Sequence, residues 1–259
     1  MKTKIFWFSG TGSSFWTAKK VNEGLKESEL IPIANYDTNQ MITADAVGIV
    51  FPVYAWGPPK IVSKFLKNIK IKPDTYIFII LTYNKDCGLT AKRVDKILHK
   101  KNLKLSASFG IKMPNNYPPL YKTSDINKIE ENFKNAVDDV NQIIKSLKQN
   151  KTGNFEKAGL SKKILSKLIY PLFINLINKM SKSFYADSKC NQCGICEKIC
   201  PNKNIVIENN KISWQNNCEQ CFACFHWCPK NSIQFGKKTT GQIRYQFPEV
   251  KLNELIVKK

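Results

Sequence analysis

The stretch Lys4-Ile5-Phe6-Trp7-Phe8-Ser9-Gly10-Thr11-Gly12-Ser13-Ser14 lies near the N-terminus of this 259-residue chain and decides the fold of its larger part. Its apolar half predicts a buried strand, and the residues after Ser14 predict a helix. Between the two, glycines let the backbone close around a phosphate, hydroxyls add donors, and the helix N-terminus favours negative charge. The loop from Ser9 to Ser14 therefore predicts a phosphate-binding site, although a serine- and glycine-rich turn is often only a turn.

Two other phosphate-binding loops do not match these residues. The loop has no Gly-Lys-Ser or Gly-Lys-Thr ending, so it is not a P-loop. Phe15 stands where a dinucleotide fingerprint needs glycine, which disfavours NAD(P) as the resident ligand.

The first 150 residues alternate apolar runs with amphipathic segments, which is typical of a doubly wound α/β sheet. The third and fourth runs are continuously apolar, as expected of parallel strands buried on both faces. We expect a parallel five-stranded sheet of order 2-1-3-4-5. The predicted strands are Lys4–Phe8, Leu30–Ala34, Ala46–Val53, Tyr76–Tyr83 and Leu105–Ile111, and the predicted helices are Ser14–Leu25, Pro59–Asn68, Thr90–Lys101 and Ile126–Lys148.

Two further segments follow the third and fourth predicted strands, at the sheet edge where open α/β folds bind ligands. Tyr54 and Trp56 are candidates to stack on a ligand ring, and the alternative is that they are ordinary loop aromatics. The candidate binding residues here are Pro52, Val53, Tyr54, Ala55, Trp56 and Gly57 in the first segment, and Thr82, Tyr83, Asn84 and Gly88 in the second.

The loop Ser9–Ser14 resembles the phosphate-binding loop of flavodoxins, and the two later segments fall where a flavodoxin holds its flavin ring. The resemblance implies FMN as a cofactor. It also implies that backbone amides from Asn84 to Gly88 contact the polar edge of the ring and that Met113–Tyr117 covers it.

Eight of the nine cysteines form a repeat near the C-terminus, and Cys87 stands apart. Because no export signal is present, metal ligation is favoured over disulfides. Paired zinc sites are the alternative, but they leave the third and fourth cysteines and the two following prolines unexplained. The spacing is typical of two [4Fe–4S] clusters, each taking its fourth ligand from the other motif. The predicted ligands are Cys190, Cys193, Cys196 and Cys228 for one cluster, and Cys218, Cys221, Cys224 and Cys200 for the other.

This repeat resembles bacterial-type two-cluster ferredoxins, and the whole chain resembles a family of flavodoxin–ferredoxin fusions from anaerobes. The resemblance implies a small α+β ferredoxin-like domain after the flavodoxin-like one. The expected organisation is an FMN-binding domain over 1–150, a helical connector over 151–186, a ferredoxin domain over 187–240 and a C-terminal tail over 241–259.

The connector contains apolar residues at helical spacing from Leu160 to Ile177, with lysines between them. Such a basic amphipathic helix suits an anionic membrane surface, a dimer contact or a buried connector between domains. We expect the buried connector.

The formal net charge of +21 invites a nucleic-acid partner, but no helix-turn-helix or basic-aromatic stripe supports one. Lysines are spread along the whole chain, so the charge favours acidic partners. The sequence has neither a secretory signal nor an apolar run of membrane-spanning length, and we expect a cytoplasmic protein.

These features predict an electron-transfer protein that relays electrons between two [4Fe–4S] clusters and FMN, and on to other redox proteins such as acidic ferredoxins or oxidoreductases. The alternative is a ferredoxin-dependent flavin reductase that acts on a small-molecule acceptor. A redox-sensing regulator is a third hypothesis, and a homodimer is compatible with the sequence.

Overall fold

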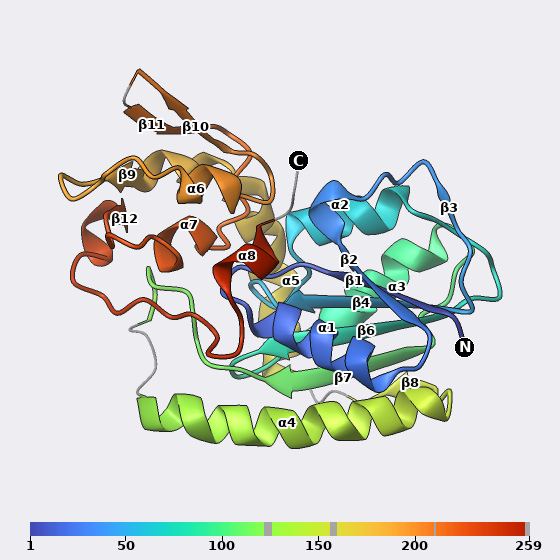
Figure 1. Cartoon of the computed structure of the whole chain (residues 1–259). Coiled ribbons are helices and arrows are strands. Elements are labelled where there is room, and N and C mark those ends of the chain that lie inside the picture. The colour runs from blue at the N-terminus through green and yellow to red at the C-terminus, as the bar shows by residue number, and fades with distance from the viewer. Residues whose placement is uncertain (122–125, 156–159, 210, 257–259) are drawn as a thin grey trace.

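The computed structural model describes residues 1–121, 126–155, 160–209 and 211–256 (Figure 1). Its centre is a six-stranded sheet of order β2-β1-β4-β6-β7-β8 in which every neighbouring pair is parallel. The strands are β1 (Thr3–Trp7), β2 (Ser28–Pro32), β4 (Ala46–Pro52), β6 (Tyr76–Tyr83), β7 (Ala107–Lys112) and β8 (Gly153–Asn154).

The first five of these strands have the predicted order 2-1-3-4-5, which is the flavodoxin-like arrangement. The prediction of five strands is wrong by one, because the short strand β8 pairs with β7 at the edge. The second strand begins and ends two residues earlier than predicted, since Ile33–Asn35 forms a 3₁₀ turn, η1.

Helices cover both faces of the sheet, as the continuously apolar central strands require. Alternate residues of β4 and β6 enter different cores: Val50 and Ile80 pack on the face of α1 and α4, whereas Ile49 and Ile79 pack on the face of α2 and α3. The helices are α1 (Ser13–Gly24), α2 (Lys60–Asn68), α3 (Thr90–His99) and α4 (Ile126–Lys148). A small parallel pair, β3 (Met41–Ile42) and β5 (Lys70–Ile71), lies outside this sheet.

The cysteine-rich segment is built from two equivalent halves. Each half has a four-residue helix, α6 (Ile195–Lys198) or α7 (Ala223–His226), that begins after a left-handed residue. Left-handed backbone recurs at matching places in the two motifs, at Gln192 and Gln220 and again at Lys203 and Asn231. The remaining elements are the hairpin β10 (Ile205–Glu208) and β11 (Lys211–Trp214), the antiparallel pair β9 (Phe184–Ala186) and β12 (Ile233–Phe235), and the 3₁₀ turns η2 (Lys179–Ser183) and η3 (Gly236–Lys238).

The C-terminal residues form part of the main core. Tyr245, Phe247, Val250 and Leu255 are buried against α1 and the first sheet face, and α8 (Leu252–Leu255) ends the described chain there. The Phe247 backbone N–H donates to the carbonyl oxygen of Thr11 at 2.9 Å. This long-range packing was not predicted, because residues 241–259 show no helical or strand periodicity of useful length.

Helix α5 (Leu160–Leu176) follows the sheet domain and stands behind the junction with the cysteine-rich segment in Figure 1. The expectation that its apolar stripe is buried is wrong for six of its residues, which are exposed: Ile164, Leu165, Leu168, Ile169, Leu172 and Leu176. Contacts to the sheet domain come instead from its other face, where Ser166 is buried. Among the described helices, none has the length and hydropathy to cross a bilayer.

Candidate functional site

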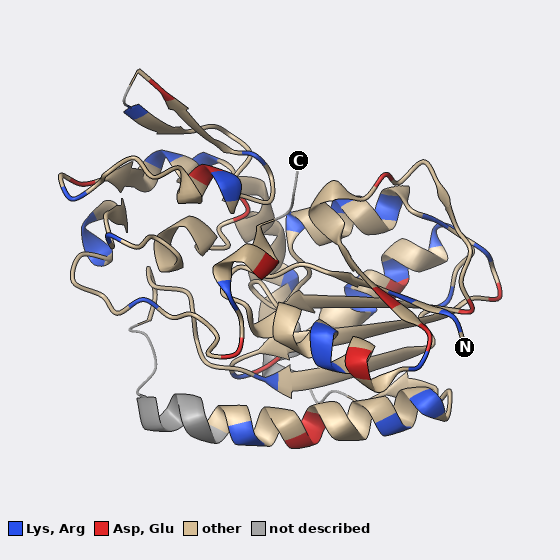
Figure 2. Ribbon diagram, in the orientation of Figure 1, with Lys and Arg blue, Asp and Glu red and all other residues tan. Residues whose placement is uncertain are grey.

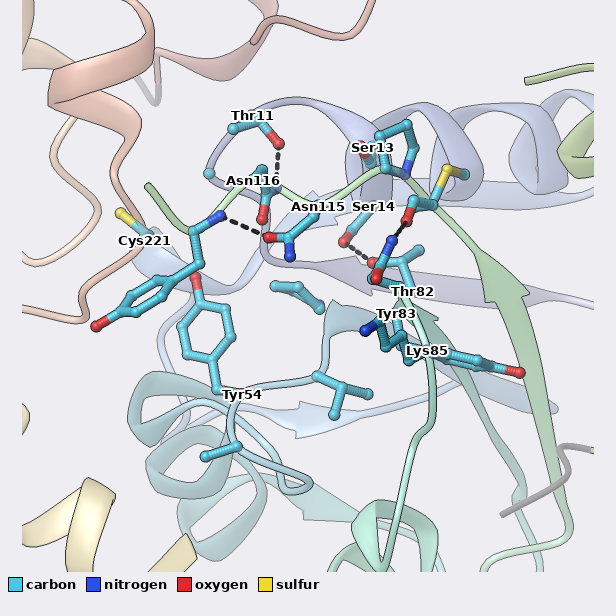
Figure 3. A pocket seen from close by; sticks show the side chains of 18 of the residues that line it. Thr11, Ser13, Ser14, Tyr54, Thr82, Tyr83, Lys85, Asn115, Asn116 and Cys221 are labelled. Carbon is cyan, nitrogen blue, oxygen red and sulfur yellow. Dashed lines mark hydrogen bonds between the residues drawn. The ribbon is translucent and has the colours of Figure 1, made fainter. Parts of the chain in front are cut away.

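A cavity of about 500 Å³ opens at the carboxyl edge of the sheet (Figure 3). The loops after β1, β4, β6 and β7 form its walls, and α5 and the cysteine-rich segment close two of its sides. The predicted binding residues that line it are Ser9, Gly10, Thr11, Ser13, Ser14, Pro52, Val53, Tyr54, Ala55, Trp56, Thr82, Tyr83 and Asn84.

Three predicted residues, Gly12, Gly57 and Gly88, lie behind this wall and do not line it. Gly12 has φ 103° at the start of α1, and a Cβ there would stand 3.0 Å from the Phe247 Cβ. A Cβ on Gly88 would come within 2.4 Å of the Trp56 Cβ. These glycines therefore allow close packing behind the wall, and a bulky residue at Gly12 would disturb the C-terminal packing first.

Hydroxyl groups of the first loop are held in place by residues distant in sequence. Asn116 Nδ2 donates to Thr11 Oγ1 at 2.6 Å, and the Ser14 and Thr82 hydroxyls are 2.7 Å apart (Figure 3). The first N–H groups of a helix have no partner within it, and α1 carries no acidic residue in its first turn. The N-terminus of this helix is thus suited to an anionic group.

The loop after β4 is a strained two-residue turn. Tyr54 and Gly57 exchange two backbone hydrogen bonds of 2.9 Å, and Ala55 and Trp56 between them have φ of 46° and 63°. Left-handed backbone costs such residues roughly 1–2 kcal/mol each and persists where surrounding structure holds it.

Helix α5 supplies part of that support to the turn. Ser166 Oγ donates to the Trp56 carbonyl oxygen at 3.0 Å, and the Tyr170 hydroxyl donates to the Pro58 carbonyl oxygen at 2.7 Å. The strained turn is therefore fixed by contacts from a helix more than a hundred residues away in sequence.

Two tyrosines of the cavity wall are uncharged at neutral pH. Burial raises the pKa of Tyr54 well above its ordinary value, and burial raises the pKa of Tyr117 to about 12. Both rings therefore offer neutral, largely apolar surfaces suited to a planar ligand.

The cysteines gather into two groups of four around two small cavities. One cavity is lined by Cys190, Cys193, Cys196 and Cys228, and the other by Cys200, Cys218, Cys221 and Cys224. Each group thus takes one cysteine from the opposite motif, as the spacing predicts. All nine cysteines lie in the described part of the chain, and none of them forms a disulfide.

Backbone N–H groups point at the sulfurs in the same pattern in both halves. The N–H of Gln192 and that of Gln220 donate to Cys190 Sγ and Cys218 Sγ, at 3.4 and 3.3 Å. The fourth cysteine of each motif accepts from the residue four positions on, Asn204 to Cys200 at 3.2 Å and Ser232 to Cys228 at 3.4 Å. Such bonds favour thiolates. Among the described side chains, no group of three or more His, Cys, Asp or Glu converges closely enough to hold a single metal ion.

The second cysteine group touches the large cavity. Cys221 lines both, and a Cβ added to Gly10 would lie 2.3 Å from the Cys221 carbonyl oxygen. Trp227 Nε1 donates to the Gly10 carbonyl oxygen at 3.0 Å beside this contact. The first loop and the second cysteine motif are therefore packed backbone against backbone.

His226 joins three parts of the molecule, and both of its ring nitrogens are engaged by backbone groups. Its Nε2–H donates to the Asn116 carbonyl oxygen and its Nδ1 accepts from the Tyr245 N–H, both at 3.0 Å. Burial lowers the pKa of His226 to about 4, so the ring is neutral and can act as donor and acceptor at once.

Several cavity residues escaped prediction from the sequence. They are Leu120, Tyr121, Ile169, Phe173 and Gln220. Other wall residues were predicted in a different role: Cys221 as a cluster ligand, Lys85 and Asp86 only through their backbone amides, and Met113–Tyr117 only as a cover for the site. Gln220 stands between two predicted metal ligands, and Ile169 and Phe173 stand in the connector stripe. No periodicity or motif indicates that these residues meet the first loop, because the contacts depend on how the segments pack.

Comparison with known proteins finds no matching family model and no matching curated protein. Solved structures match part of the chain. A Streptococcus pneumoniae TIGR4 flavodoxin is 12% identical over 55% of this chain and 99% of its own, with a TM-score of 0.38. A flavoprotein of Lactobacillus acidophilus in complex with FMN is 18% identical over 42% of this chain and 92% of its own, with a TM-score of 0.35. Rubredoxin oxygen:oxidoreductase from Desulfovibrio gigas is 16% identical over 57% of this chain and 36% of its own, with a TM-score of 0.38. At these values the fold assignment rests on the strand order and connections of the sheet.

Proposed function

We propose that the protein is an intramolecular electron relay in which two [4Fe–4S] clusters and one FMN exchange electrons with each other and with redox partner proteins. When bound, FMN exchanges two electrons whereas each cluster carries one, so the combination links one-electron and two-electron chemistry. The observation that carries the proposal is the position of Cys221, which lines both the second cysteine cavity and the large cavity.

The donor set fits two clusters. Each small cavity is bordered by four free cysteines, one thiolate for each iron of a cubane, in the crossed pairing of two-cluster ferredoxins. Phe222 and Phe225 are fully buried beside them and exclude water, which influences cluster potential. The four N–H···S contacts add to the stabilisation of the thiolates.

The residues that line the large cavity are chemically suited to bind FMN. The start of α1 and the hydroxyls of Thr11, Ser13 and Ser14 would hold the phosphate, as at other helix N-termini that bind anions. Tyr54 and Trp56 would border the ring. A volume of about 500 Å³ falls in the range of cofactor sites.

The first cysteine group is suited to receive electrons from outside. Cys193 is exposed, whereas Cys221 of the second group faces the interior of the molecule. Exposed Lys189, Lys198 and Lys230 stand within a few residues of the first group's cysteines and would attract an acidic partner. Lys and Arg are spread over both parts of the chain (Figure 2).

The reductase alternative is favoured by one observation. Leu120 and Tyr121, both exposed, extend the cavity wall outward and leave apolar surface at its mouth. A small acceptor would meet the flavin there. Turnover with reduced ferredoxin and a panel of small acceptors separates an enzyme from a carrier, since a carrier reduces only redox proteins.

The relay is tested with anaerobically purified protein. We expect about eight iron and eight sulfide per chain, with FMN as the flavin. After rapid reduction of the clusters, the flavin absorption should bleach at a rate independent of protein concentration. A rate proportional to concentration would mean transfer between molecules and would refute the relay, and stoichiometric zinc without iron would refute the cluster assignment.

A further inference from the structure

Helix α5 displays large apolar side chains that no described part of the chain covers. Leu168 is 73% exposed, Leu172 63% and Ile164 61%. A spacing of four residues aligns these three with Leu176 along one side of the helix. The whole row, called here the α5 row, consists of Ile164, Leu165, Leu168, Ile169, Leu172 and Leu176.

The orientation of the helix is fixed by its opposite face. Ser166 and Tyr170 bind the carbonyl oxygens of the loop after β4, and the Arg93 guanidinium lies 4.2 Å from the centre of the Tyr170 ring. Arg93 also donates to the Ser166 carbonyl oxygen at 2.7 Å. The α5 row therefore cannot turn inward without breaking this packing, and it remains outward in the folded protein.

The segment of sequence that contains α5 carries charge of a single sign. Residues 157–186 contain six lysines, at positions 157, 162, 163, 167, 179 and 182, and no aspartate or glutamate. Lys167 and Lys179 are exposed next to the row. An outward apolar face flanked by lysines is the composition of helices that lie in the interface of anionic membranes.

We propose that the α5 row docks the protein on the surface of an anionic phospholipid bilayer, with the helix lying in the interfacial plane. A second copy of this chain is a poorer occupant, because pairing the same row on two molecules would bring two segments of six lysines together. Lipid headgroups supply the opposite charge over a broad surface, and the acyl region receives the leucines.

Docking would place the large cavity at the membrane surface. Ile169 belongs both to the α5 row and to the cavity wall, and Phe173 lines the same wall from the next turn. The mouth of the cavity, with Leu120 and Tyr121, would then open beside the lipid headgroups.

The test is co-sedimentation of the full, cofactor-loaded chain with phosphatidylglycerol vesicles and with phosphatidylcholine vesicles. The wild-type chain should bind the anionic vesicles more tightly, and added salt should weaken that binding. Leu168→Ser with Leu172→Ser should reduce binding by roughly tenfold or more. Met41→Ser is the matched control, because Met41 is 53% exposed on β3 and lies outside α5.

Iron and flavin contents are measured on the same samples, so that a loss of vesicle binding can be told apart from a loss of the cofactors that the proposed relay needs. Equal binding by the wild type and the double variant would overturn the proposal, as would no binding to anionic vesicles. An oligomer that the double variant dissociates, without vesicle binding, would identify a second copy as the occupant instead. Lys167→Gln with Lys179→Gln should lower binding to anionic vesicles and leave phosphatidylcholine binding unchanged.

Discussion

Gly10→Ala tests the junction between the first loop and the second cysteine motif. The added Cβ would stand 2.3 Å from the Cys221 carbonyl oxygen, 3.2 Å from its carbonyl carbon and 3.3 Å from its Cβ. Ordinary contacts between heavy atoms begin near 3.5 Å, so the two backbones must separate by about 1 Å. Neither backbone is a flexible side-chain end that can move aside.

Two contributions determine how much Gly10→Ala lowers the free energy of unfolding. Overpacking in a well-packed interior costs about 1–3 kcal/mol. Separation would also weaken the 3.0 Å hydrogen bond from Trp227 Nε1 to the Gly10 carbonyl oxygen, which contributes about 1 kcal/mol. We expect the free energy of unfolding to fall by about 2–4 kcal/mol, which corresponds to a fall in Tm of about 5–15 °C for a chain of this size.

The assay is anaerobic thermal unfolding followed by circular dichroism, with iron and flavin contents measured alongside. Gly24→Ala is the control, because its Cβ would meet side-chain atoms of Ile144 and no backbone, with Cδ1 at 2.6 Å and Cγ1 and Cγ2 at 3.0 Å, and a side chain can move aside. Since alanine is also the better helix former, this control should unfold within about 1 kcal/mol of the wild type. If Gly10→Ala melts with the wild type and retains the same rate of flavin reduction, the junction is not packed as described.

Three further results are expected. Truncation after Arg244 removes four buried side chains, those of Tyr245, Phe247, Val250 and Leu255. Because their burial contributes on the order of 6–12 kcal/mol, the truncated chain should lose cooperative unfolding. A truncated chain with a native melting curve would contradict the C-terminal packing. Cys200→Ser should damage the cluster shared with Cys218, Cys221 and Cys224 more than the other cluster, as followed by electron paramagnetic resonance. The control Cys87→Ala should keep its full iron content, and equal damage to both clusters in Cys200→Ser would argue against crossed ligation. The hydrogen bond of 2.7 Å from Lys19 lowers the pKa of Glu254, so the pair stabilises the fold above pH 4.5 and this contribution is lost as the pH falls through the lowered pKa. Glu254→Gln should therefore lower the free energy of unfolding by at most about 1 kcal/mol at pH 7, and its difference from the wild type should shrink below pH 4.5. A difference that stays constant below pH 4.5 would disprove the pairing.

The order of the main sheet and the pairing of the cysteines were both predictable from the sequence, because each depends on local pattern. Continuous apolar runs such as Val47–Phe51 and Ile77–Leu81 mark strands buried on both faces, and the short connections between elements restrict their order. The cysteine spacing restricts which sulfurs can share a cavity, and the structure gathers the same two groups of four.

The candidate cavity was predictable only in part. Residues after β1, β4 and β6 were found because parallel strands bring their carboxyl ends to one edge. Gly12, Gly57 and Gly88 were assigned to the binding surface, yet their lack of a side chain serves packing behind it. A glycine in a loop has the same appearance in the sequence whether a ligand or another side chain approaches it.

Tertiary structure alone decided how the parts meet. The sequence marked a helix over α5, but its apolar residues recur on more than one side, and periodicity cannot tell which side packs. Contacts from Ser166 and Tyr170 to the loop after β4 turned Leu168 and Leu172 outward. In the same way, the junction of Gly10 with Cys221 joins residues more than two hundred positions apart, so its free energy depends on the packing of the whole chain and leaves no local pattern.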